Sequence, residues 1–392
     1  MTAEDTAPAE AVDANIRLAA KTIPVTVLTG FLGAGKTTLL NRLLADPDMG
    51  EAAVLINEFG DVGIDHLLVK ETREDTVLLN SGCLCCTVRG DLVNAMRELF
   101  WQRFEKKIPW FKRVVIETTG LADPAPIIHT LMTDPTIGPR YRLDGIVTVV
   151  DAVNGPATLD AQPESVKQAA VADRIVLTKT DLATPEQAAE IRSRLKALNP
   201  AAPVFEVNAE FGPKDLFDAG LFSAERKIAD VAGWLRDEAY ADDHHDHHHS
   251  HNHDHGHHHE DDHDHGHGHA HDHDHDHEHH HDPNRHDTRI SSFCLVVDEP
   301  IAWDAFVTWM EMLIATQGEN LLRIKGILNI AGESAPVAVH GVQHLFHPPV
   351  ELPSWPDEAD KRSKIVFITR DIGRQAIEDT FKAFTGAIVS DR

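Results

Sequence analysis

The stretch GFLGAGKT, residues 30–37, restricts the fold of this chain more than any other feature. It matches the phosphate-binding pattern G-x-x-x-x-G-K-[ST] and lies between an apolar strand candidate (23–30) and an amphipathic helix candidate (36–46). Its glycines let successive backbone N–H groups point at phosphate oxygens. Lys36 offers a point charge to the terminal phosphates, and the Thr37 hydroxyl is a ligand for Mg²⁺. The residues expected to bind nucleotide here are Gly30, Gly33, Ala34, Gly35, Lys36, Thr37 and Thr38.

Short apolar runs alternate with amphipathic stretches between Lys21 and about Leu235. Several runs are rich in Val and Ile on both faces, which is typical of strands covered on both sides. The strand candidates are 23–30, 52–60, 76–80, 113–120, 145–152 and 173–181. Alternating strands and helices predict an α/β fold, a P-loop NTPase with a mostly parallel sheet and helices on both faces.

Composition divides the chain into four parts. Residues 1–20 are acidic and Ala-rich and are expected to be a flexible leader, followed by the P-loop domain over 21–235. The segment 236–288 is dominated by His and Asp and is predicted to be a disordered linker, because it cannot bury enough apolar surface to offset its ordering entropy. Strand and helix patterns resume over 289–392 and predict a smaller α+β domain.

Two later strands carry polar residues where a nucleotide site needs them. In VVIETTG, Glu117 ends an apolar run and can reach Mg²⁺ directly or through water, and Gly120 lets its N–H approach a γ-phosphate. In TKTD, Asp181 can accept two hydrogen bonds from guanine, whereas adenine presents an acceptor there. Lys179 would lie along the base plane, so the predicted nucleotide is GTP. The alternatives are a solvent-facing glutamate and an ordinary loop carboxylate.

Three of the four cysteines, Cys83, Cys85 and Cys86, lie within four positions. Thiolates favour zinc and other soft or borderline ions. A closed structural zinc site needs four ligands, usually as two separated pairs, so this compact cluster predicts an open site that can exchange its metal. Glu58 is expected to ligate the metal or to orient the attacking water, with a solvated loop charge as the alternative. For the thiols, a redox pair and buried apolar cysteines are the alternatives.

The charge distribution separates one segment from the rest. The formal net charge of −27 argues against a nucleic-acid partner. Residues 242–282 hold thirteen acidic residues and 22 of the 28 histidines, a composition that predicts metal binding, with a merely solubilising segment as the alternative. The absence of an 18-residue apolar run and of a secretory signal predicts a cytoplasmic protein with no membrane span.

With these motifs the chain resembles the CobW-type metallochaperone GTPases, relatives of the UreG and HypB nickel-insertion GTPases. The likeness spans roughly residues 21–390 without the linker. It depends on GFLGAGKTTLL, NEFG, SGCLCC, ETTGLADPAPI, ADRIVLTKTDL and HGVQHLFHPP, in that order. The resemblance implies that Glu117 replaces the usual strand-end aspartate. It also implies that Lys179 and Asp181 read guanine, with Thr178 at the first position of that motif.

The resemblance also implies an activity: slow GTP hydrolysis coupled to delivery of zinc, or of cobalt in some members, with a C-terminal CobW-type domain. The expected cofactors are GTP, Mg²⁺ and Zn²⁺. The expected ligands are Cys83, Cys85, Cys86 and Glu58 for zinc, and Thr37 and Glu117 for Mg²⁺. The expected partners are a client metalloprotein and, in one nucleotide state, a second copy of the chain. The alternatives are insertion of cobalt, nickel or iron into one enzyme, and a His-rich metal store.

Overall fold

The computed structural model describes residues 22–57, 77–81, 88–217, 289–387 and 389, and every structural statement below concerns these residues. The predicted leader, Glu58, the three clustered thiols and the His/Asp-rich segment lie outside them. The expectations for those parts therefore stay predictions.

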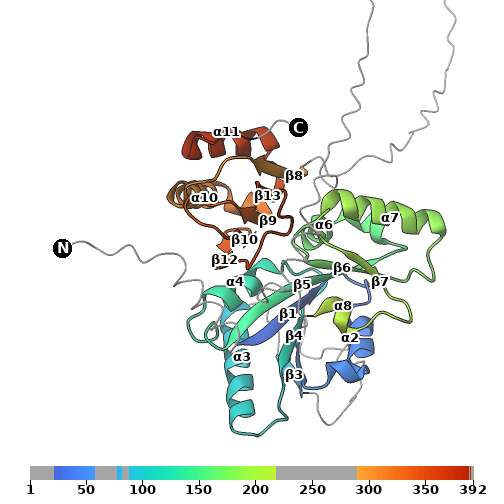
Figure 1. Cartoon of the computed structure of the whole chain (residues 1–392). Coiled ribbons are helices and arrows are strands. Elements are labelled where there is room, and N and C mark those ends of the chain that lie inside the picture. Colours follow the sequence, from blue (N-terminus) through green and yellow to red (C-terminus); the bar gives the residue numbers. More distant parts are fainter. Residues whose placement is uncertain (1–21, 58–76, 82–87, 218–288, 388, 390–392) are drawn as a thin grey trace, which may run out of the picture.

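The N-terminal part forms one sheet of seven strands in the order β3-β2-β4-β1-β5-β6-β7 (Figure 1). Every adjacent pair is parallel. The strands are β1 (Ile23–Thr29), β2 (Ala52–Asn57), β3 (Val77–Ser81), β4 (Arg113–Glu117), β5 (Tyr141–Asp151), β6 (Arg174–Thr178) and β7 (Val204–Glu206). The predicted P-loop NTPase sheet is confirmed, and within the described residues it is entirely parallel.

Helices cover both faces of this sheet because both faces are apolar. α3 (Val88–Phe104) and α4 (Ala125–Thr133) pack with Val25 and Val27 of β1 on one face. α2 (Lys36–Leu44) packs with Leu28 on the other. The remaining short helices of this part are η1 (Pro47–Met49), α5 (Gly155–Ala161), α6 (Pro163–Ala170), α7 (Pro185–Leu198) and α8 (Pro213–Leu216).

Parallel strands bring their carboxyl ends to one edge, and this edge carries the candidate site. Strand register aligns Leu28 of β1 with Glu117 of β4, Glu117 with Ile56 of β2, and Ile56 with Asn80 of β3. β3 lies three strand spacings from β1, which is about 14 Å. The ends of β2 and β3, from which the chain continues towards Glu58 and the thiols, therefore belong to the same edge as the phosphate loop.

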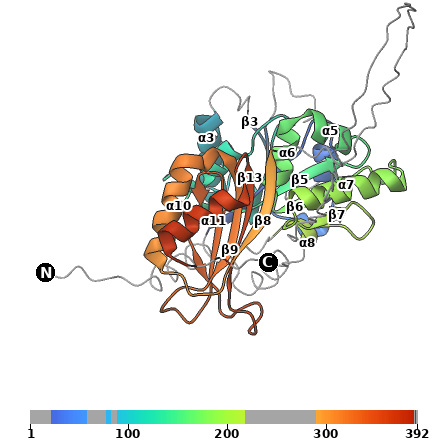
Figure 2. The ribbon, with the colours of Figure 1, turned by 90° about the horizontal axis from the view of Figure 1, so that it is seen from above.

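The C-terminal part is a six-stranded sheet in the order β11-β10-β9-β13-β8, with β12 paired to β10, and every pair is antiparallel. Its elements are β8 (Ile290–Val297), α10 (Trp303–Gln317), η4 (Gly318–Asn320), β9 (Leu321–Leu328), β10 (Val337–Val342), β11 (Leu345–Phe346), β12 (Val350–Glu351), β13 (Ser363–Arg370) and α11 (Arg374–Thr385). α10 and α11 cover one face of this sheet (Figure 2). The expected α+β architecture of this part is confirmed.

The two sheets share an apolar core. Leu322, Val342, Leu345 and Ile368 of the C-terminal part belong to the same buried cluster as α3 and α4. Figure 1 shows the C-terminal sheet standing beside α4 and the adjoining end of the parallel sheet.

A buried ion cluster lies at the same boundary. Asp173, just before β6, pairs with Arg323 and with Lys325 (3.1 Å), both from β9, and accepts a hydrogen bond from the Ile146 amide at 3.0 Å. Burial opposes ionisation of Asp173, but the two cations and the Ile146 amide outweigh it and lower its pKa to about 2. Burial also lowers the pKa of Arg323, although a guanidinium starts so high that it stays charged.

Candidate nucleotide and metal site

The loop between β1 and α2 has a backbone path that favours glycine. Gly33 and Gly35 have φ angles of 74° and 92°, a region that side chains rarely adopt. At Gly30 an added Cβ would lie 2.3 Å from the Val149 carbonyl oxygen, so β5 leaves no room for a side chain. A glycine-lined turn that leads into a helix N-terminus is suited to binding phosphate.

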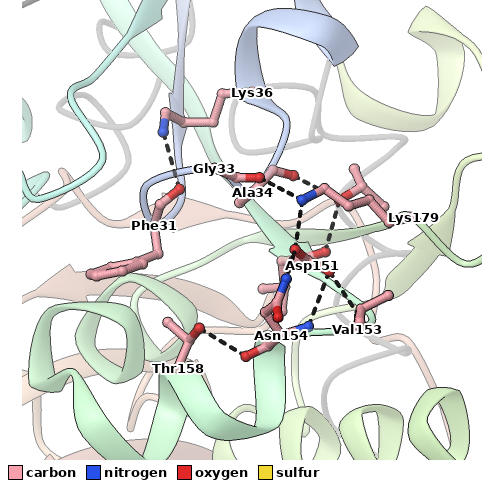
Figure 3. Close-up of polar contacts among 11 residues, drawn as sticks. Phe31, Gly33, Ala34, Lys36, Asp151, Val153, Asn154, Thr158 and Lys179 are labelled. Carbon is pink, nitrogen blue, oxygen red and sulfur yellow. Dashed lines mark hydrogen bonds and ion pairs between the residues drawn. The ribbon is translucent and has the colours of Figure 1, made fainter. Parts of the chain in front are cut away.

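Lys36, the first residue of α2, folds back across this loop. Its ammonium donates to the carbonyl oxygen of Gly30 at 2.9 Å. It also donates to the carbonyl oxygen of Phe31 at 3.3 Å (Figure 3). The side chain is buried, so its positive charge is concentrated inside the loop rather than directed to solvent. A triphosphate in the loop would meet this charge with little screening by water.

Thr37 and Glu117 come together from neighbouring elements. The Thr37 hydroxyl donates to Glu117 Oε1 at 2.7 Å, and Glu117 is buried at the end of β4. The Thr118 hydroxyl donates to the Thr29 hydroxyl at 2.9 Å and its amide to the Leu28 carbonyl at 2.9 Å, which fixes the end of β4 to β1. A hydroxyl and a carboxylate side by side are oxygen donors of the kind that Mg²⁺ prefers, so these residues fit the expected ion.

The chain beyond β4 lies against the phosphate loop. A Cβ at Gly120 would lie 2.6 Å from the Leu32 amide nitrogen, so only glycine permits this approach. The buried Gln168 amide donates to the carbonyls of Gly120 at 3.3 Å and Ala122 at 3.0 Å. Gln168 therefore holds the turn in place. Sequence reasoning missed it because it lies in α6, far along the chain and outside any motif.

The end of β6 is tied to the same loop by two side chains. The Thr178 hydroxyl donates to the Ala34 carbonyl at 2.7 Å. Lys179 donates to the Gly33 carbonyl at 2.8 Å and to Asp151 Oδ2 at 2.7 Å (Figure 3). The threonine at the first position of this motif thus links the base-reading segment directly to the phosphate loop.

Asp151, at the end of β5, is a second site residue that sequence reasoning missed. Burial opposes its ionisation, but hydrogen bonds from Lys179, Asn154 and the amides of Val153 and Asn154 outweigh this effect and lower its pKa. It is therefore a carboxylate at neutral pH and orients Lys179. The signal in the sequence was its place at the end of an apolar run, which the structure shows to be the strand next to β1. Asp181, two residues beyond Lys179, is exposed and accessible to a base.

The expected zinc ligands adjoin this edge in the sequence. β2 ends at Asn57, directly before Glu58, and β3 ends at Ser81, two residues before Cys83. Those ligands themselves lie outside the described residues. Within the described part of the chain, no group of three or more His, Cys, Asp or Glu side chains is arranged to hold a metal. The fourth cysteine, Cys294, is buried in β8.

None of the helices in the described ranges combines the length and hydropathy of a membrane span. Residues 24–206 match the family described as CobW/HypB/UreG, nucleotide-binding domain. Residues 290–385 match the cobalamin synthesis protein cobW C-terminal domain.

Individual relatives extend the likeness over nearly the whole chain. The zinc chaperone YjiA of Escherichia coli is 32% identical over 360 residues, which cover 92% of this chain and 98% of that protein. Zinc-regulated GTPase metalloprotein activator 1 of Schizosaccharomyces pombe is 38% identical over 191 residues, 47% of this chain and 45% of that protein. A crystal structure of zinc-bound YjiA GTPase from E. coli has a TM-score of 0.63 at 27% identity and covers 93% of this chain and 99% of its own. The chain therefore belongs to the CobW/HypB/UreG family and carries the family's cobW C-terminal domain.

Proposed function

We propose that this protein is a GTP-hydrolysing zinc chaperone of the cytoplasm, which takes up zinc on Cys83, Cys85 and Cys86 and passes it to a client protein. The observation that carries the proposal is the position of β3 and β2, which end beside β4 at the edge that holds the phosphate loop. The names of the relatives, a zinc chaperone and a zinc-regulated GTPase, support both zinc and GTP.

The proposed reaction is attack of water on the γ-phosphate of GTP. Lys36 and the backbone amides of the phosphate loop hold the β- and γ-phosphates and offset the charge that develops during transfer. Thr37 and Glu117 would hold Mg²⁺, which neutralises charge on the phosphate oxygens when bound. The Gly120 amide lies close enough to the loop to approach the γ-phosphate. Guanine would be read by Asp181, with Lys179 kept along the base by Asp151 and Gly33.

Coupling of hydrolysis to zinc follows from this arrangement. GTP and Mg²⁺ would hold the segments after β2 and β3 so that the thiolates, with Glu58, offer zinc one geometry. Loss of the γ-phosphate would remove contacts that order those segments, and the ion would be released to the client.

Zinc titration in three nucleotide states tests this coupling. We expect the wild type to bind zinc more tightly with a GTP analogue than with GDP or without nucleotide, and the triple variant C83S/C85S/C86S to lose that difference. Cys294→Ser is the matched control, because this buried thiol of the C-terminal sheet should leave the titration unchanged. Equal zinc affinity in all nucleotide states of the wild type would refute the coupling.

Deletion of residues 242–282 tests the role of the His/Asp-rich run. We expect fewer zinc ions bound per chain, measured by equilibrium dialysis. The rate of GTP hydrolysis should stay close to that of the full chain, because every residue assigned above to the nucleotide site lies outside the run. Acidification towards pH 5 should release ions from the full chain, since protonated imidazoles do not bind metal. A deletion variant that no longer hydrolyses GTP would show that the run does more than collect metal.

A nucleotide-dependent homodimer is the second proposed partnership. Leu32 in the phosphate loop, Leu121 after β4 and Leu182 after β6 are exposed. All three follow carboxyl ends of the parallel strands, so they give the nucleotide edge an apolar character that a second copy would cover.

A further inference from the structure

Three aromatic side chains within ten residues of one another in sequence are exposed at the end of α3 and in the loop that follows it. Trp101, Phe104 and Trp110 are 46%, 70% and 56% exposed, and they form what we call the aromatic patch. Among the other Phe and Trp side chains in the described ranges, Phe384 is comparably exposed, at 42%. A single exposed aromatic needs no explanation, whereas three within ten residues mark an interaction surface.

The aromatic patch is held in a defined shape. The Trp101 and Phe104 rings meet edge to face, with centroids 5.8 Å apart at 87°. The Arg103 guanidinium lies 3.4 Å from the centroid of the Trp110 ring, and its Nε donates to the Phe111 carbonyl at 3.0 Å. Rings fixed before binding lose little conformational freedom on binding, which is the property of residues that dominate interface energies.

The surroundings of the patch are basic in a chain that is strongly acidic. Residues 97–113 contain six Lys or Arg and two Glu, against a net charge of −27 for the whole chain. Lys106 and Lys107 are exposed between Phe104 and Trp110. Lys107 pairs with Glu105 and Lys112 with Glu51. The basic side chains still outnumber the carboxylates, so the local field attracts a negatively charged ligand, and the aromatic rings offer it apolar contact.

We propose that the aromatic patch docks an acidic segment with apolar side chains on the client protein, an inference that rests on the proposed function. A nucleic acid or an anionic membrane would extend far beyond the patch and meet the acidic remainder of the chain. A short acidic segment stays within reach of the local basic charges, because screening limits such attraction to about 8 Å at physiological salt.

The dimensions of α3 connect the patch to the proposed metal site. α3 begins at Val88, two residues after Cys86, and its 17 residues span about 25 Å. A client domain of about 100 residues has a radius of gyration of about 13 Å, and its diameter is more than twice that value. A domain bound to the patch therefore reaches the start of the helix. The patch lies at the opposite end of α3 from the nucleotide edge, and it leaves that edge accessible.

Fluorescence anisotropy with a short labelled peptide of alternating Asp/Glu and Leu/Phe tests the proposal on the full-length protein. We expect it to bind at least about tenfold more tightly than the same peptide with Lys in place of Asp and Glu. Phe104→Ser and Trp110→Ser should each weaken binding by about tenfold or more. The double variant K106E/K107E should weaken binding and reduce its dependence on salt. Phe384→Ser, at an exposed aromatic elsewhere, should bind like the wild type.

Four outcomes would overturn the proposal. The first is unchanged peptide binding by the two aromatic variants. The second is tighter binding of single-stranded oligothymidine or phosphatidylserine vesicles than of the acidic peptide. The third is a rise in peptide affinity of about tenfold on removal of residues 1–20 or 242–282, which would mean that the chain's own acidic segments occupy the patch. The fourth is dissociation of a dimer by the patch substitutions, which would mean that a second copy of the chain occupies it. GTP hydrolysis and zinc binding of the Phe104, Trp110 and Lys106/Lys107 variants should match those of the wild type. A wild type that binds the peptide but neither hydrolyses GTP nor binds zinc would contradict the proposed function alone.

Discussion

Replacing Lys36 by alanine is expected to lower kcat for GTP hydrolysis by at least about 100-fold. Negative charge spreads over the phosphate oxygens during transfer, and the Lys36 ammonium lies inside the phosphate loop, 2.9 Å from the Gly30 carbonyl oxygen. Buried in this way, the charge is only weakly screened, so its removal costs more than that of a surface lysine. Phosphate release at saturating GTP and Mg²⁺ is the measurement.

The matched control is Lys196→Ala, at an exposed lysine near the end of α7. It should leave kcat unchanged. Because Lys36 also donates to loop carbonyls, the melting temperature of both variants should be compared with that of the wild type. A fully folded Lys36→Ala variant with wild-type kcat would rule out the proposed role of this residue.

Replacing Asp173 by asparagine is expected to destabilise the protein by about 3–5 kcal/mol, because it leaves Arg323 and Lys325 buried without their carboxylate. For a protein of this size the melting temperature should fall by roughly 4–8 °C, which differential scanning calorimetry would measure. Replacing all three residues by apolar ones, Asp173→Leu with Arg323→Met and Lys325→Met, should recover most of the loss, since none of the three then carries a charge.

The exposed pair Arg289–Asp371 is the control, and Asp371→Asn should leave the melting temperature close to that of the wild type, because water already screens this pair. The pH dependence gives an independent check. The pKa of Asp173 is about 2 in the folded protein and about 3.9 in an unfolded chain. Its stabilising contribution is therefore complete above about pH 4 and is lost as the pH falls through 2. The stability difference between wild type and Asp173→Asn should shrink over that interval. A difference that stays constant would mean that ionisation of Asp173 does not stabilise the folded protein.

The phosphate loop and the strand pattern could be predicted because both depend on neighbouring residues. Gly30 to Thr37 follow a motif whose backbone requirements are local, and the apolar runs read directly as strands. Asp151 and Gln168 could not be found in this way. Asp151 meets Lys179 across 28 positions and Gln168 meets Gly120 across 48, so only the strand order brings them together.

The buried ion cluster shows the same limit in the C-terminal part. In LLRIKGIL, the alternation of apolar and charged residues predicts a strand, and β9 is one. The alternation does not show whether Arg323 and Lys325 contact water or a carboxylate. Their partner Asp173 lies 150 positions before Arg323, just before β6 of the other sheet. Strand ends were less predictable still: the run 113–120 continues as β4 only to Glu117, because the residues after it turn towards the phosphate loop.

The apolar cluster shared by the two sheets has a consequence for how this chain can vary over evolutionary time. Leu322, Val342, Leu345 and Ile368 attach the C-terminal sheet to the parallel one through side chains, and none of them lies within the 71 positions from 218 to 288 that join the two sheets. Lengthening a connection costs little free energy when its ends are already fixed. Substitutions, insertions and deletions of histidines in this stretch should therefore leave the apolar contacts between the two sheets unchanged.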